Sequence, residues 1–266
     1  MQNFFQDGVM MSLILKVLFV IIIYMTIWFF IALAKKRNDV ADVAWGPGFI
    51  LTAFISLLMA GSFSDRALIT TAMVFLWGIR LAVHIGNRHV GKPEDARYAQ
   101  WRKEWGKTFL LRTFLQVFML QGVLLFLVAA PIIVINTAPP SQISVLDILG
   151  ICIWILGFTF ETVSDWQLAQ FFKIPSKKGG VMTTGLWRYS RHPNYFGEVT
   201  LWWGIYIIAL SVPNGWMSII GPLTITFLIL KVSGIPMLEE GFRDNPDFQQ
   251  YKERTSIFIP LPPRKE

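Results

Sequence analysis

The segment GLWRYSRHPNYFGEVTLWWG, residues 185–204, contains a group of cations that is followed by the start of an apolar stretch. Pro193 suits the first turn of a helix, where its missing N–H would have no intrahelical partner in any case. Arg188, Arg191 and His192 would then precede a helix N-terminus, whose backbone N–H groups and dipole favour an anion. The pattern therefore predicts an anion-binding site at the start of a membrane helix.

Three side chains beyond this start could hold the uncharged part of the same ligand. Asn194, Glu198 and Trp202 follow at intervals of four and so line one side of the helix. A polyanion at the cations could extend a ribose or a ring toward Asn194 and Glu198. Such a ligand resembles a nucleotide cofactor, although the chain has no Gly-rich phosphate loop of the Rossmann type.

Other polar side chains interrupt the apolar stretches of the chain. Ionisable groups inside membrane segments are costly, so they usually mark a site or a buried ion pair. The spacing places Arg80, His84 and Asn87 on one helix face and Glu161 and Asp165 on another. We expect these groups to converge on a cavity open to the cytoplasm. The full set is Asp42, Arg80, His84, Asn87, Glu161, Asp165 and Glu198.

The composition predicts the elements that must position these groups. Of the 266 residues 54% are hydrophobic and 15% are charged, and the mean hydropathy is +0.50. These values predict an integral membrane protein, an all-α polytopic bundle with about seven transmembrane helices. The expected spans are Val17–Ala34, Val43–Gly61, Ala67–Gly86, Thr113–Ile135, Leu146–Trp166, Val199–Pro213 and Trp216–Leu230.

The loop charges predict the orientation of the bundle. Lys and Arg gather in alternate loops, which the positive-inside rule assigns to the cytoplasm. We therefore expect the N-terminus outside, the C-terminus in the cytoplasm and the cofactor site facing the cytoplasm. The cations border membrane segments, so the net charge of +7 does not indicate nucleic acid. Three histidines and one cysteine, without an HExxH or paired-cysteine motif, predict no metal site.

One loop predicts a helix at the membrane surface. EDARYAQWRKEWGK, residues 94–107, spaces Tyr98, Trp101 and Trp105 three and four residues apart among charges. We interpret this helix as a surface anchor. Without repeats or a long soluble insertion, residues 1–266 are expected to form a single integral membrane domain.

Several motifs together resemble a known family. DVAWGPGF, FETVSDWQ and GLWRYSRHPNYFGE are similar to bacterial membrane proteins related to the steroid 5-alpha-reductase C-terminal domain. The resemblance runs from Asp39 to about Pro262 and is densest between Glu161 and Gly204. The RHPNY core is also shared with the isoprenylcysteine carboxyl methyltransferases, so this core alone does not distinguish hydride transfer from methyl transfer.

The resemblance implies NADPH as the cofactor, gripped without a Rossmann domain by motifs concentrated in residues 161–262. It carries the family's cofactor contacts onto Asp165, Tyr189, Asn194, Glu198 and Trp202, with Arg191 and Lys178 as looser matches for phosphate partners. His192 is a predicted cofactor-binding residue through the anion site described above. The steroid enzymes polarise the substrate carbonyl with a glutamine-glutamate pair and a tyrosine. This sequence departs there, and the tyrosine's position lies near Trp77. Asp42 and Arg80 are therefore the predicted catalytic residues.

The resulting hypothesis is an NADPH-dependent oxidoreductase, similar to the steroid 5-alpha-reductases, that acts on the CH–CH group of a lipophilic enone. Its substrate would be a steroid, sterol or isoprenoid. The alternative is an S-adenosylmethionine-dependent membrane methyltransferase of the isoprenylcysteine type. Asp165 within SDWQ favours the reductase. We expect a monomer in the bacterial inner membrane, with membrane lipid and a lipophilic small molecule as its partners.

Overall fold

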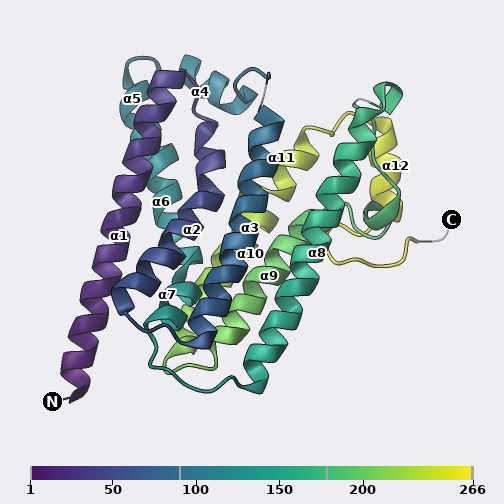
Figure 1. Cartoon of the computed structure of the whole chain (residues 1–266). Helices are drawn as coiled ribbons and strands as arrows, with labels where there is room; N and C mark the ends of the chain where they lie inside the picture. The colour runs from purple at the N-terminus through teal and green to yellow at the C-terminus, as the bar shows by residue number, and fades with distance from the viewer. Residues whose placement is uncertain (1, 90, 178, 265–266) are drawn as a thin grey trace. The chain divides into compact units, whose positions relative to one another are not determined.

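The structure is a computed structural model that describes residues 2–89, 91–177 and 179–264, without the side chains of residues 2–10 and 177. Within these ranges the chain forms helices, turns and loops and contains no strand. The predicted all-helical class is therefore confirmed. The chain divides into two compact units, and each is described separately (Figure 1).

The first unit contains Met1–Ile143 and Val212–Ile220. Its long helices pack in sequence order, α1 on α2 and α2 on α3. The chain then continues through short helices, one of which is the π-helical segment η2. The elements are α1 (Gln2–Lys35), α2 (Val40–Ala60), α3 (Asp65–His89), α4 (Ala96–Trp105), η1 (Gly106–Thr108), α5 (Phe109–Arg112), η2 (Thr113–Met119), α6 (Leu120–Val128), α7 (Ala130–Thr137) and η5 (Gly215–Ile219).

The second unit contains Ser144–Ser211 and Gly221–Glu266. Two long helices, α8 and α9, form its core, and a polar C-terminal segment follows. The elements are α8 (Val145–Lys173), η3 (Pro175–Lys177), η4 (Gly185–Arg188), α9 (Pro193–Ala209), α10 (Ile220–Phe227, of which Ile220 belongs to the first unit), η6 (Leu228–Val232), α11 (Ile235–Glu240) and α12 (Pro246–Arg254).

Glycines allow α8 and α9 to approach until their backbones touch, and the two helices run side by side in Figure 1. A Cβ atom on Gly157 would lie 2.6 Å from the carbonyl oxygen of Gly197, and still nearer to the Leu201 nitrogen. Gly150 and Gly204 form a second such crossing, in which a Cβ on Gly150 would lie 2.6 Å from the Gly204 carbonyl oxygen. Small residues at a helix interface permit this close packing in membrane proteins.

Local sequence signals begin the helices of the second unit. Ser144 and Asp147 form a capping box at the start of α8, with the Ser144 N–H donating to Asp147 Oδ2 at 2.7 Å. Pro193 is the first residue of α9, as the sequence predicts. Asn245 caps α12 by accepting from the Phe248 N–H at 3.1 Å.

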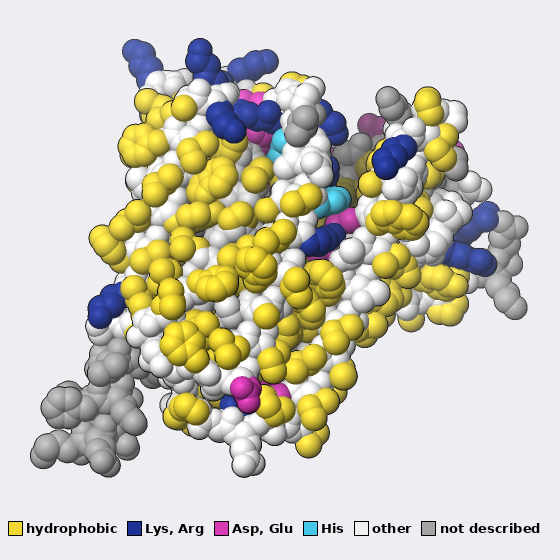
Figure 2. Space-filling model, in the orientation of Figure 1, with side chains coloured by type: hydrophobic (Ala, Val, Ile, Leu, Met, Phe, Trp, Pro, Cys, Tyr) yellow, Lys and Arg dark blue, Asp and Glu magenta, His cyan; other side chains and the backbone are white. Residues whose placement is uncertain are grey.

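Six helices among the described residues are long and apolar enough to cross a membrane. Large apolar side chains on them are exposed, as lipid-facing positions require; Phe19, Phe30 and Leu58 are examples. Hydrophobic side chains cover much of the visible surface of these helices in Figure 2. The six are Met11–Lys35, Val40–Ala60, Asp65–His89, Ala96–Val128, Val145–Lys173 and Gly215–Glu240. These helices confirm a multi-pass membrane protein.

The remaining predicted span, Val199–Pro213, lies largely in α9, which has 17 residues and is shorter than the six. The count of seven and the orientation of the termini stay predictions. The predicted surface helix at residues 94–107 is present as α4.

The crossing of α8 and α9 predicts that Gly157→Ala destabilises the second unit. The added methyl group would overlap the α9 backbone, and overpacking of this kind costs about 1–3 kcal/mol. Thermal unfolding of the purified protein in mild detergent measures the loss.

The matched control is Gly86→Ala, because a Cβ on Gly86 of α3 has no atom within 4 Å. This change should leave the unfolding temperature unchanged or raise it slightly. Equal unfolding temperatures for Gly157→Ala and the native protein would contradict the close crossing.

Candidate functional site

The close crossing of α8 and α9 brings two predicted cofactor residues together. Asn194, in the first turn of α9, donates an N–H from its Nδ2 to Asp165 Oδ1 of α8 at 3.1 Å. The Asp165 side chain is buried, and Asn194 is half-buried. Side chains 29 positions apart in the sequence thus form one polar pair.

This pair leaves an acceptor for a ligand. The Oδ1 atom of Asn194 is buried and accepts no hydrogen bond within the described part of the chain. A buried carbonyl oxygen without a donor is costly, so a donor supplied by a ligand or by water would stabilise the site. Among the predicted cofactor residues, Asn194 thus offers an unused hydrogen-bonding atom.

The other two residues of the predicted α9 face differ in exposure. Glu198, one turn beyond Asn194, is half-buried. Trp202, one turn further, is completely buried. A ring with no exposed surface contributes packing in this arrangement, so the predicted contact between Trp202 and a cofactor would require a rearrangement.

The segment before α9 forms hydrogen bonds with the part of α8 that carries Asp165. Gly185 adopts a φ of +64° beside Gln167, and the Leu186 N–H donates to Gln167 Oε1 at 3.0 Å. The indole N–H of Trp187 donates to the Ser164 carbonyl oxygen at 3.1 Å. Two side chains of the segment, Arg188 and the predicted cofactor residue Tyr189, are exposed and could meet a ligand from solvent.

Two residues of the predicted anion site, Arg191 and His192, face inward instead. Arg191 Nε and His192 Nε2 each lie 3.0 Å from Glu239 Oε1 of α11. Arg191 is 5% exposed and His192 is 1% exposed. Lys252 Nζ of α12 lies 3.6 Å from the second oxygen of Glu239. Arg191 and His192 could therefore bind a phosphate only if this ion pair opened.

The C-terminal segment forms hydrogen bonds with the residues that precede α9. The Arg191 N–H donates to the Ser256 carbonyl oxygen at 2.8 Å, and the Leu261 N–H donates to the Tyr189 carbonyl oxygen at 2.9 Å. Ser190 Oγ donates to the Phe258 carbonyl oxygen at 2.8 Å. These bonds fix the backbone that carries the exposed side chains Arg188 and Tyr189.

A buried tyrosine, Tyr251, adds to these hydrogen bonds. The Tyr251 hydroxyl is within hydrogen-bonding distance of the carbonyl oxygens of Trp187 and Ser190. Burial raises the pKa of the Tyr251 phenol above its ordinary value, so the group stays a donor. Sequence reasoning missed both Glu239 and Tyr251, which lie in the polar segment after the last predicted span, Trp216–Leu230.

The first unit contains the predicted catalytic residues. Asp42 lies in the first turn of α2, and its Oδ1 accepts the hydroxyl of Tyr98 from α4 at 3.0 Å. Arg97 NH2 lies 3.6 Å from Asp42 Oδ2. Arg80 is half-buried on α3, one turn before His84. Tyr98 is therefore a second site candidate, which the sequence indicated only as part of a surface helix.

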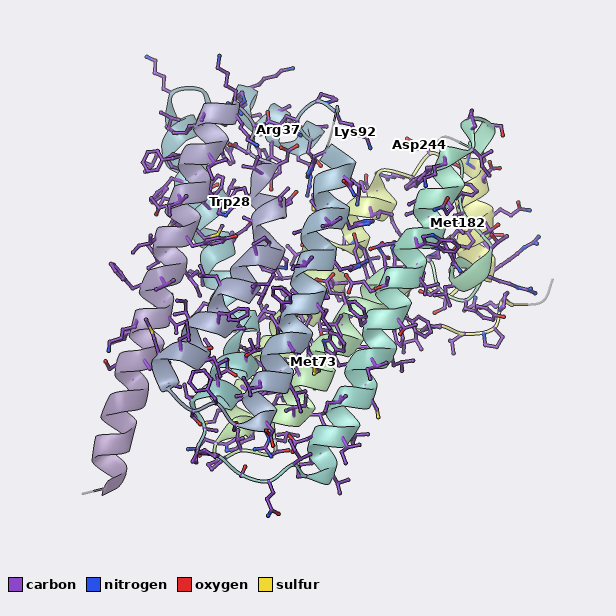
Figure 3. All side chains as sticks on the ribbon, in the orientation of Figure 1. Trp28, Arg37, Met73, Lys92, Met182 and Asp244 are labelled. Carbon is purple, nitrogen blue, oxygen red and sulfur yellow. The ribbon has the colours of Figure 1, made fainter. Side chains whose placement is uncertain are left out.

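A network of ion pairs is centred on Asp39, three residues before Asp42. Arg37 donates to both oxygens of Asp39, at 2.6 and 2.7 Å, and the Asp95 N–H donates to Asp39 Oδ2 at 3.0 Å. The His89 ring lies 3.7 Å from the same oxygen. Figure 3 labels Arg37 and Lys92 at this end of the unit, where the guanidinium lies 3.4 Å from the Lys92 carbonyl oxygen. The network joins the α1–α2 turn to the α3–α4 loop.

Two further predictions receive no structural test. Lys178, a predicted phosphate partner, lies outside the described residues. A search of the described residues for groups of His, Cys, Asp and Glu that could hold a metal ion gives none.

Comparisons with known proteins add the family. A family model with the description "Protein of unknown function (DUF1295)" matches residues 28–255. This region contains every predicted catalytic and cofactor-binding residue, from Asp42 to Trp202. Searches of the curated proteins and of the solved structures give no match.

The Asp39 network predicts that acid destabilises the first unit. Burial alone would raise the pKa of Asp39, but the bonds from Arg37 and the Asp95 N–H lower this pKa below 3.8. Because the folded-state pKa is the lower one, the stabilisation is complete well above pH 3.8 and is lost as the pH falls through the folded value. Unfolding temperatures between about pH 5 and pH 2 measure this loss.

The variant Asp39→Asn should lower the free energy of unfolding by about 2 kcal/mol at neutral pH and flatten the acid dependence. The control is Asp244→Asn, at an exposed position of the second unit labelled in Figure 3. If Asp39→Asn keeps the native acid profile, the network does not carry the effect.

The Glu239 ion pairs predict that Glu239→Gln loosens the segment before α9. Removing one partner of a buried ion pair costs about 3 kcal/mol, because Arg191 would remain buried without its counter-charge. Amide hydrogen exchange should accelerate in residues 185–192 and 255–264.

The neighbouring change Glu240→Gln is the control. Glu240 pairs with Arg243 at the surface, where both side chains are more than 70% exposed, and such pairs contribute little. Identical exchange in the two variants would refute the role of Glu239.

Proposed function

The chain belongs to the DUF1295 family, and from this membership and the polar pair at the α8–α9 crossing we propose that it is an integral membrane reductase that uses NADPH. Its substrate would be a lipophilic enone of the steroid, sterol or isoprenoid type. The resemblance of the FETVSDWQ and RHPNY motifs to the steroid 5-alpha-reductases supports the choice of cofactor. We propose further that the protein acts as a monomer in the bacterial inner membrane, with the cofactor side in the cytoplasm.

The observation that carries the proposal is the unused acceptor of Asn194. Its amide is held in place by the bond to Asp165, while its buried Oδ1 accepts nothing from the described residues. A ribose hydroxyl or a carboxamide N–H has the donor that this oxygen lacks. The Asp165 carboxylate accepts hydrogen bonds and repels phosphate. The pair therefore suits the uncharged parts of a dinucleotide.

The remaining charged side chains near the start of α9 have different roles toward the ligand. Arg188 is exposed beside the start of α9 and is suited to a phosphate, whereas Arg191 and His192 are committed to Glu239. Tyr189 offers an exposed phenol. In this proposal Arg191 and His192 fix the backbone of the segment, and the phosphate contact belongs to Arg188. NADPH, when bound, supplies the hydride for the reduction.

Asp42 and Arg80 of the first unit stay the proposed catalytic residues. Tyr98 donates a hydrogen bond from its hydroxyl to Asp42 Oδ1 at 3.0 Å, so the phenol holds this carboxyl group in place and leaves Asp42 Oδ2 for a proton. In this proposal Asp42 acts as the acid for the developing enolate oxygen, and Arg80 supplies positive charge. Trp77, which lies near the position of the tyrosine in the steroid enzymes, is buried against Phe49 with ring centroids 5.4 Å apart.

The cofactor proposal predicts selective stabilisation by NADPH. A ligand that binds only the folded state stabilises it by about 2.7 kcal/mol at a hundredfold excess over its Kd. The unfolding temperature in detergent should rise with NADPH, rise less with NADH and stay constant with S-adenosylmethionine. Stabilisation by S-adenosylmethionine alone would favour the methyltransferase and reject the reductase.

The site itself predicts that Asn194→Ala weakens NADPH binding about tenfold, because the ligand loses one buried hydrogen bond and the support from Asp165 loosens. Titration calorimetry measures the Kd, and the unfolding temperature without ligand checks the fold. Gln249→Ala, which removes an exposed amide of the same unit, is the control. Unchanged affinity in Asn194→Ala would place the cofactor elsewhere.

A further inference from the structure

At the end of the first unit where α1 lies close to α4, the acidic side chains pair with arginines of the same unit. Asp39 binds Arg37, and Asp95 binds Arg97. Glu94 accepts from Arg102 NH2 at 3.0 Å and from the Asn38 N–H at 2.6 Å. These carboxylates therefore neutralise the arginines beside them and leave the other cations of this end uncompensated.

Among the exposed cations of this end, we name five the cationic platform: Lys35, Lys36, Lys103, Lys107 and Arg112. Within the described ranges none of the five forms an ion pair. The nearby exposed carboxylate, Glu104, accepts from Gln100 at 2.6 Å. The α1 and α4 parts are joined, because Arg102 NH2 donates to the Lys36 carbonyl oxygen at 3.3 Å. Figure 2 shows Lys and Arg side chains gathered at this end of the unit.

Aromatic rings lie between these cations. Trp101 and Trp105 stack with ring centroids 5.2 Å apart and an interplanar angle of 12°. The Arg102 guanidinium lies 4.4 Å from the ring centroid of Phe109. Indole rings at this position are typical of the membrane interface, where one part of the ring is apolar and the other meets water.

The chain changes from cationic to apolar within one turn. Lys107 is exposed, while Leu110 and Leu111 of α5 are 57% and 63% exposed. Arg112 follows directly. Exposed leucines beside cations are unfavourable against water alone, but they match the boundary between phospholipid headgroups and acyl chains.

We propose that the cationic platform binds the headgroups of anionic phospholipids, with Leu110 and Leu111 in contact with their acyl chains. The platform carries positive charge, and none of its five side chains forms an ion pair with the described residues. Anionic headgroups supply the opposite charge at the same depth. The proposal does not rest on the proposed reductase activity.

The test compares two lipids on the whole protein. The full chain is reconstituted in nanodiscs of equimolar phosphatidylglycerol and phosphatidylcholine, released into mild detergent, and its retained lipids are counted by native mass spectrometry. The native protein should retain phosphatidylglycerol in about tenfold excess at low salt. The excess should fall as salt is raised, because exposed charges are screened.

Matched variants locate the binding. Lys35→Gln, Lys103→Gln and Lys107→Gln combined should bring the two lipids near parity. Lys16→Gln, Lys173→Gln and Lys231→Gln combined, which remove three exposed lysines elsewhere, should keep the excess. Unfolding temperatures in phosphatidylcholine alone check that both variants fold. Equal retention by the native protein, an excess that salt does not reduce, or equal loss in both variants would overturn the proposal.

Discussion

The contact between the backbones of α8 and α9 is the constraint on which the second unit depends. Side chains normally keep two helices 8–10 Å apart, but glycines on both helices remove that spacer. The crossing at Gly157 and Gly197 lies one to two turns from Asp165 and Asn194, so the short side chains of these two residues can reach each other. A wider crossing would separate them. The geometry of the candidate site therefore follows from residues that have no chemistry of their own.

A second constraint acts at the N-terminal end of α9. Arg191 and His192 are buried, and burying charge is costly unless a partner and further hydrogen bonds accompany it. Glu239 supplies the partner, and the backbone of residues 252–261 supplies the hydrogen bonds. The result is a stiff segment whose outward face carries Arg188 and Tyr189. Stiffness of this kind reduces the entropy that a ligand must overcome on binding.

Much of the fold could be predicted from the sequence. Apolar runs located the membrane helices, and Pro193 located the start of α9, because both signals are local. The pairing of Asp165 with Asn194 could be predicted in part, because both are polar residues expected at the same depth in the membrane. Other features depend on long-range contacts that no periodicity records. Glu239 lies 47 positions from His192, in a tail that the sequence suggested only as polar.

The burial of Tyr98 was missed for a related reason. Its spacing with Trp101 and Trp105 indicated a helix on the membrane surface, and α4 is a helix with those two indoles half-buried. The same spacing does not reveal that one face of the helix packs on the first turn of α2, where Tyr98 meets Asp42. Likewise, side-chain type suggested Arg191 and His192 as ligand contacts, but only the structure gives their internal partner.

The most direct test of the account is an experimental structure of the protein with NADPH, at a resolution that defines the side chain of Asn194. The account predicts nucleotide density beside the α8–α9 crossing, with a ligand donor within about 3.2 Å of Asn194 Oδ1 and the Arg191–Glu239 ion pair intact. Nucleotide density away from Asp165 and Asn194, or an Asn194 Oδ1 that accepts from the protein alone while NADPH is bound, would contradict it.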